Sequence, residues 1–162
     1  MKHTLSVLVE NKPGVLTRIT GLFARRGFNI DSLAVAETEN PLFSRISITV
    51  DGETQPVEQV TKQLHKLINV LKITDLDPSE RMERELLLVK VKATAENRAE
   101  IMQVAEIFEG KIVDITPGTA VIEVTGPRHK VEALIELLRS MNVVVELIRT
   151  GRVGIRRGPK PT

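Results

Sequence analysis

The sequence lacks cysteine, tryptophan and tyrosine, and it has only four phenylalanines among 162 residues. Without cysteine, a disulfide framework and thiolate chemistry are both excluded. The scarcity of rings disfavours proteins that stack bases on aromatic side chains. The longest apolar runs span four residues, whereas a membrane-spanning helix needs about 18 or more. No apolar signal segment follows Met1, so we expect a cytoplasmic protein with neither a nucleic-acid nor a membrane partner.

The basic residues are concentrated at one end of the chain. The formal net charge is +2, yet residues 149–162 contain five basic side chains and no acid. These five are Arg149, Arg152, Arg156, Arg157 and Lys160. Elsewhere the 21 acidic residues outnumber the basic ones, so the main body does not suggest a polyanionic partner. The tail from 151 to 162 is rich in Gly, Arg and Pro, and we expect it to be mobile.

Hydrophobic periodicity predicts the order strand, helix, strand, strand, helix, strand, twice over. In the first half the predicted strands are 4–9, 28–37, 43–50 and 70–76, and the predicted helices are 15–26 and 57–68. In the second half the predicted strands are 84–93, 111–116, 119–125 and 143–150, and the predicted helices are 101–108 and 127–141. Gly27, Gly110 and Asn142 stand where left-handed residues commonly end helices.

This element order predicts an α+β protein made of two tandem ferredoxin-like βαββαβ domains. The predicted domains are 1–77 and 84–150, joined by a polar linker at 78–83. Right-handed crossovers place both helices on one face of each four-stranded antiparallel sheet. Each half is small for independent stability, so we expect a homodimer formed by edge pairing or face packing. The polar sheet face carrying Arg45, Ser47 and Thr49 is expected to be exposed and available to a partner.

Signatures of catalysis and metal binding are missing from the sequence. His3, His65 and His129 are isolated and show no metal-ligand spacing. The glycines at 151–158 have the wrong spacing for a dinucleotide fingerprint, and no helix is predicted after them. An RNA-recognition domain needs aromatic rings on its central strands, and the strand 43–50 offers one. We therefore expect no catalytic residue, metal or cofactor on this chain.

The segment from residue 10 to 16 connects the first strand to the first helix and has the composition of a ligand loop. Gly14 allows close approach of a ligand, and the first helical N–H groups can bind a carboxylate. Asn11 offers a donor and an acceptor, which suits a zwitterion, and Val15 and Leu16 can add an apolar wall. The residues alone also permit an ordinary strand–turn–helix connection in which Asn11 caps the helix.

The sequence Asn11-Lys-Pro-Gly-Val-Leu16 after a βαββαβ first strand resembles the ligand loop of ACT domains. The segments 10–18, 21–27 and 28–33 together are similar to the small regulatory subunits of acetolactate (acetohydroxyacid) synthase. The resemblance continues through Ser44-Arg45, 83–90, 108–114 and 151–154, and so covers essentially the whole chain.

The resemblance implies a non-catalytic subunit of branched-chain amino acid biosynthesis. Such a subunit activates a large catalytic subunit that carries thiamine diphosphate, magnesium and FAD, and it confers feedback inhibition, typically by valine. The family pairs two ACT domains edge to edge, with the effector at their interface. A free-standing tandem ACT sensor of another amino-acid pathway is the alternative.

The resemblance also implies a set of effector-binding residues. Carried over by position, one chain supplies Asn11, Pro13, Gly14, Val15 and Leu16, and the other supplies Asn29 and Ile30. Without the resemblance, Asn29 would be interpreted as a turn residue at the start of a strand.

Overall fold

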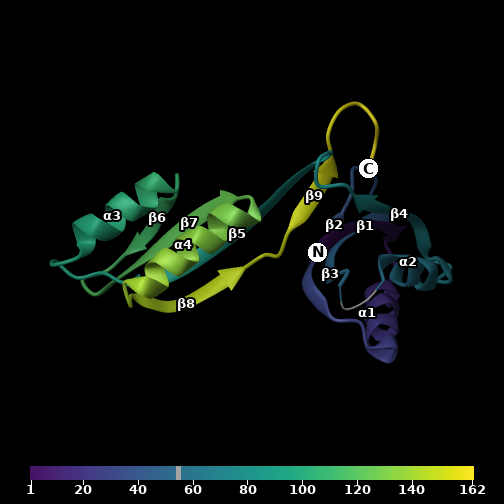
Figure 1. The fold of residues 1–162 in the computed structure, drawn as a ribbon, viewed down its shortest axis with the longest axis horizontal. Helices are drawn as coiled ribbons and strands as arrows, with labels where there is room; N and C mark the ends of the chain where they lie inside the picture. The colour runs from purple at the N-terminus through teal and green to yellow at the C-terminus, as the bar shows by residue number, and fades with distance from the viewer. Residues whose placement is uncertain (54–55) are drawn as a thin grey trace. The chain divides into compact units, whose positions relative to one another are not determined.

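The chain folds into two compact units in the computed structural model, which describes residues 1–53 and 56–162. Unit 1 consists of Met1–Met82 together with Arg152–Thr162, and unit 2 consists of Glu83–Gly151 (Figure 1). None of the helices in the described ranges is long and apolar enough to cross a membrane.

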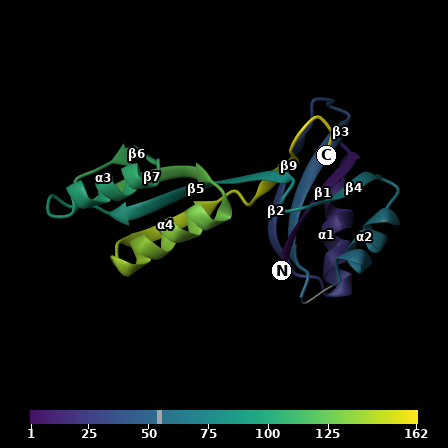
Figure 2. The ribbon, with the colours of Figure 1, turned by 45° about the horizontal axis from the view of Figure 1, so that its top comes forward.

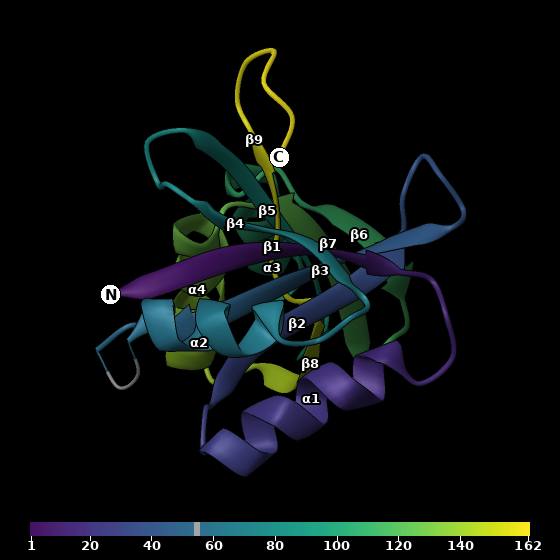
Figure 3. The same ribbon diagram turned by 90° about the vertical axis from the view of Figure 1, so that its right-hand side faces the viewer.

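Unit 1 has the ferredoxin-like arrangement expected from the periodicity. Its elements are β1 (Lys2–Glu10), α1 (Val15–Arg26), β2 (Ile30–Glu37), β3 (Phe43–Asp51), α2 (Val57–His65) and β4 (Val70–Leu76). The sheet order is β2-β3-β1-β4, and every pairing is antiparallel. The two edges of the sheet are therefore β2 and β4 (Figure 3).

The core of unit 1 lies between this sheet and its two helices, which cover the same face (Figure 2). Alternate residues of the central strands point into it, including Leu5, Val7, Ile46 and Ile48, none of which is exposed to solvent. The apolar stripe of α1 packs against them. Gly27 ends α1 in the left-handed conformation (φ 69°), and its N–H donates to the Ala24 carbonyl, as predicted for a helix cap.

Unit 2 repeats the order with a second core. Its elements are β5 (Arg81–Lys92), α3 (Arg98–Ile107), β6 (Lys111–Ile115), β7 (Thr119–Gly126), α4 (Arg128–Ser140) and β8 (Val144–Arg149). The strand order is β6-β7-β5-β8, which corresponds element by element to unit 1. Asn142 has the expected left-handed conformation after α4. After α3 the left-handed residue is Glu109 rather than Gly110, because the helix ends at Ile107, one residue earlier than predicted.

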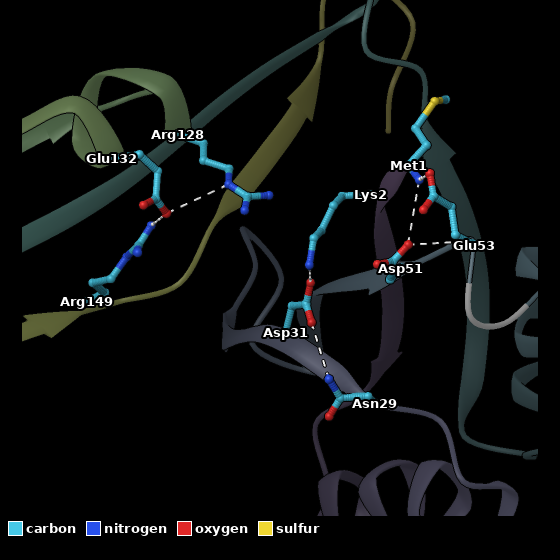
Figure 4. A network of polar contacts seen from close by, with 9 residues as sticks. All are labelled: Met1, Lys2, Asn29, Asp31, Asp51, Glu53, Arg128, Glu132 and Arg149. Atoms are coloured by element: carbon cyan, nitrogen blue, oxygen red, sulfur yellow. Dashed lines mark hydrogen bonds and ion pairs between the residues drawn. The ribbon is translucent and has the colours of Figure 1, made fainter. Parts of the chain in front are cut away.

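A charged cluster joins the first and last strands of unit 2. The Glu85 carboxylate is buried and ion-paired with Arg149, whose guanidinium also contacts Glu132 at 2.9 Å. Glu132 lies between Arg149 and Arg128 in Figure 4. The guanidinium of Arg149 donates hydrogen bonds to the carboxylates of Glu85 and Glu132, and these bonds raise the pKa of Arg149. The cluster therefore fixes β8 against β5 where both strands leave the unit.

The C-terminal residues differ from the expected mobile tail. Residues 152–162, here called the strap, belong to unit 1 and include a ninth strand, β9 (Val153–Arg156), which pairs with β5. The Lys72 ammonium donates to the Thr162 carbonyl at 2.9 Å, and the Arg152 N–H donates to the Ser32 hydroxyl at 2.8 Å. No local pattern in the sequence indicates this strand, because its pairing partner, β5, is distant in sequence.

The strap covers the polar face of the unit 1 sheet. A Cβ added to Gly154 would lie 2.9 Å from the Leu76 side chain and 3.6 Å from that of Thr4, so the strap backbone rests closely on these strands. Ser47 and Thr49 are only 5% and 0% exposed. The expectation that this face is exposed is therefore wrong, because the terminal residues return to pack on unit 1.

Candidate effector site

The turn between β1 and α1 leaves backbone donors without partners. Gly14 is the N-cap residue of α1, with φ 85°, and no side chain caps this helix. The Val15 N–H makes a long contact of 3.4 Å to the Lys12 carbonyl. Within the described ranges, no carbonyl accepts from the N–H groups of Gly14, Leu16 or Thr17. These groups and the helix dipole form a site suited to a carboxylate.

Asn11 does not cap the helix, although the residues alone permitted that interpretation. Its Nδ2 amide donates to the Glu37 carboxylate at 3.3 Å and to the Pro41 carbonyl at 3.0 Å. Its backbone N–H donates to the Leu42 carbonyl at 2.8 Å. Both amide protons are thus directed at the turn after β2, which fixes the side chain. The Oδ1 acceptor has no partner among the described residues and can receive a donor from a ligand.

The charge at the start of this turn is locally neutralised. Lys12 contacts the Glu10 carboxylate at 2.7 Å, and this hydrogen bond is the main reason that the pKa of Glu10 lies below its ordinary value. Asn69 also donates to Glu10, while its Oδ1 accepts from Arg18 at 2.7 Å. Glu10 is therefore ionised at neutral pH and matched by Lys12. In contrast, Glu37 makes no ion pair within the described part of the chain.

The apolar residues near the turn divide into core and surface. Val15 is only 5% exposed and its side chain packs in the core, so this side chain does not supply the apolar wall that was expected. Leu16 is 38% exposed and Pro13 is also exposed, so both can contact a ligand. Leu42 lies after β2 and is 71% exposed. Its carbonyl accepts the hydrogen bond from the Asn11 N–H, so this residue also lies near the turn and can contact a ligand.

Asn29 and Ile30 lie at the opposite end of β2. Asn29 is exposed and donates to Asp31 at 3.4 Å, while Asp31 is ion-paired with Lys2. Figure 4 shows Asp31 between these two side chains. Ile30 is partly buried against the core. The Asn29 amide is therefore anchored by a charged pair and remains open to solvent.

The predicted site residues consequently form two groups that do not meet within one chain. Asn11 is bonded to Glu37 at the end of β2, whereas Asn29 precedes its first residue, Ile30. At about 3.3 Å per residue, the eight steps from Asn29 to Glu37 span roughly 26 Å. A small amino acid cannot reach both groups of the same chain.

Sequence reasoning missed Glu37 and Leu42, which the turn after β2 brings to Asn11. Asn40-Pro41 signalled that turn. The missing information was the pairing of β1 with β3, in which Glu10 lies opposite Phe43. That register places the two turns side by side. No group of three or more potential metal-binding side chains is found in the ranges 1–53 and 56–162.

Two family models match the chain and indicate the class of protein to which it belongs. The family model described as the AHAS small subunit-like ACT domain matches residues 5–72, so unit 1 is an ACT domain. The model described as the small subunit of acetolactate synthase matches residues 84–158. Together the two matches cover most of both units.

Full-length relatives give the same result. The chain is 51% identical over 160 residues to a probable acetolactate synthase small subunit of Archaeoglobus fulgidus, covering 99% of both chains. It is 45% identical to the acetolactate synthase small subunit of Haemophilus influenzae, covering 99% of this chain and 98% of the relative. The crystal structure of the small subunit from Thermotoga maritima matches with a TM-score of 0.89 at 48% identity, with 99% of each chain covered.

The chain therefore belongs to the acetolactate synthase small-subunit family. Membership implies a regulatory role, and the fold is the predicted pair of ferredoxin-like βαββαβ domains.

Proposed function

We propose that this protein activates the thiamine diphosphate-dependent catalytic subunit of an acetolactate synthase and confers feedback inhibition by valine. Thiamine diphosphate, magnesium and FAD are expected on that catalytic chain. The observation that carries the proposal is the turn before α1, where the N–H groups of Gly14, Leu16 and Thr17 and the Oδ1 of Asn11 all lack hydrogen-bond partners within the described ranges. Donors and an acceptor in one turn suit the two charged ends of an α-amino acid.

The chemistry of each end follows from its surroundings. The valine carboxylate binds at the N-terminus of α1, where backbone N–H groups and the helix dipole favour an anion. The ammonium donates to Asn11 Oδ1 and is matched by the nearby Glu37 carboxylate, which has no competing ion pair in the described ranges. The exposed side chains of Leu16 and Leu42 are suited to contact the isopropyl group.

A homodimer completes the site. The strap closes the polar face of the unit 1 sheet to face packing, which leaves the edge strands. β2 is an edge strand whose outer hydrogen-bonding groups are open to another strand. A two-fold antiparallel pairing of β2 strands, centred between Leu33 and Ala34, places Ile30 of one chain opposite Glu37 of the other. Asn29 of the partner then lies beside Asn11, and symmetry produces two such sites.

Regulation follows from linkage between this seam and the catalytic subunit. Valine can inhibit only if it binds the inhibited arrangement more tightly than the active one. A tenfold shift needs about 1.4 kcal/mol of differential affinity. One charge-assisted hydrogen bond contributes about 1.5–3 kcal/mol, so a contact formed in only one arrangement is sufficient.

The test has two parts. The purified chain is titrated calorimetrically with L-valine, L-leucine, L-isoleucine and D-valine, and it is then added to a catalytic subunit with and without L-valine. We expect stereoselective binding, a rise in acetolactate formation, and its suppression by L-valine. Binding without activation of the catalytic subunit would favour the free-standing sensor. Activation without binding of any amino acid would refute the effector site.

A further inference from the structure

The strap forms a cavity with the polar face of unit 1. Its volume is about 320 Å³, and it is lined on one side by β3 and on the other by the strap. The strap contributes Arg156 and Lys160, and β3 contributes Arg45. Glu39 is the one acidic side chain among the lining residues, which also include the C-terminal residue Thr162. The lining therefore has an excess of positive charge.

The guanidinium groups of Arg45 and Arg156 are each anchored by one hydrogen bond. Arg45 Nη1 donates to the Ser6 hydroxyl at 2.7 Å, and Arg156 Nη1 donates to the Pro161 carbonyl at 3.0 Å. In the described ranges no carboxylate pairs with either arginine or with Lys160, so their other donors remain available. Anchoring by one hydrogen bond lowers the conformational entropy that these side chains lose on binding a ligand.

An anion would remove the repulsion among these cations. Arginine donors match the paired oxygens of phosphate and carboxylate groups, and lysine adds a compact charge. The volume falls within the range of small-molecule sites, about 300–1,000 Å³. Gly158, which lines the cavity with φ 81°, has open space where a Cβ would stand.

We propose that this cavity is a second ligand site, which binds a small multivalent anion such as a phosphate ester or a polycarboxylate. It shares none of the residues predicted for the valine site, although Glu39 lies two residues after Glu37. Because the ligand bridges β3 and the strap, its binding stabilises the docked strap against unfolding.

The test is calorimetric titration of the full chain with inorganic pyrophosphate, and in parallel with citrate, at an ionic strength of about 0.15 M, where charges more than about 8 Å from the ligand are largely screened. We expect saturable binding that weakens at least tenfold in Arg156→Gln. The matched control is Arg157→Gln, which removes the same charge from the adjacent residue. Arg157 does not line the cavity, and its backbone N–H is bound to the Glu80 carbonyl in either case. This control should change the affinity less than about twofold.

A second variant separates ligand binding from docking of the strap. Arg45→Gln leaves the strap sequence intact and should also weaken binding at least tenfold, while circular dichroism reports whether the fold is retained. Preference for pyrophosphate assigns the site to phosphoryl compounds, and preference for citrate assigns it to polycarboxylates. Absence of saturable binding to both, or equal losses in Arg156→Gln and Arg157→Gln, would overturn the proposal.

Discussion

Substitution of Gly14 by alanine separates the stability of the β1–α1 turn from its role in binding. Gly14 is left-handed (φ 85°), and a Cβ added there meets no atom within 4 Å. The cost is therefore backbone strain of about 1–2 kcal/mol, partly offset by the reduced freedom of the unfolded chain. We expect a net loss of about 1 kcal/mol in the free energy of unfolding.

The effect of this substitution on valine binding should be larger. The new methyl group stands at the helix N-terminus, where a carboxylate oxygen must approach an N–H to about 2.9 Å. Carbon atoms need about 3.5 Å, so at least one charge-assisted hydrogen bond is lost. At about 1.5–3 kcal/mol, that loss raises Kd roughly 10- to 150-fold. Gly14→Asp should be worse, because its carboxylate would repel that of the effector.

Gly27→Ala is the matched control, because Gly27 is also left-handed and open at the other end of α1. Stability is measured by urea unfolding followed by circular dichroism, since the chain has no tryptophan or tyrosine, and Kd by calorimetry. Both variants should lose similar stability, and only Gly14→Ala should lose valine affinity. Unchanged binding by Gly14→Ala, or equal losses in both variants, would refute the reasoning.

Three further variants test other contacts. Glu37→Gln should weaken L-valine binding about tenfold by calorimetry but leave binding of 2-oxoisovalerate, which lacks the ammonium, unchanged; equal weakening of both would exclude an ammonium role. Glu85→Ala should lower the free energy of unfolding, measured in urea, by about 2 kcal/mol, because Arg149 loses its buried partner but keeps some solvent contact. A decrease of less than about 0.5 kcal/mol would contradict this. Hydrogen bonds from Ser79 lower the pKa of Asp77, so their stabilisation is complete above the unfolded pKa of about 3.9 and is lost as pH falls through the folded pKa. Ser79→Ala should therefore lose less stability than the wild type between pH 5 and pH 2, and identical acid unfolding curves would count against this coupling.

Local patterns were sufficient to predict the element order of both units. Alternation in β3 and the helical stripe of α1 specify which face of each element is apolar, and right-handed crossovers then leave one arrangement for the sheet. The family comparison supports the same fold.

Long-range contacts were not predictable from local pattern. The strap is rich in Gly and Pro and has no strong periodicity. The formation of β9 therefore depends on its pairing with β5, which local pattern does not reveal. The same limit applies to the candidate site. Asn11, Gly14 and Leu16 were identified from the turn before α1, whereas Glu37 reaches Asn11 only through the pairing of β1 with β3. The side chain of Val15 was expected to contact a ligand but is buried. The periodicity of α1 shows which face is apolar, but it does not show which residues at the edge of that face are covered.

The most direct test of a site shared between two chains is complementation between two variants that each bind L-valine weakly. Asn11→Ala and Asn29→Ala chains are each titrated with L-valine alone, and then again after they are mixed and their subunits exchanged. Each variant alone should bind weakly. Each mixed dimer contains one site with both substitutions and one site with neither. Random exchange makes half of the dimers mixed, so the mixture should regain about a quarter of the wild-type sites at wild-type affinity. A mixture that binds no better than its components would contradict an effector site built from two chains.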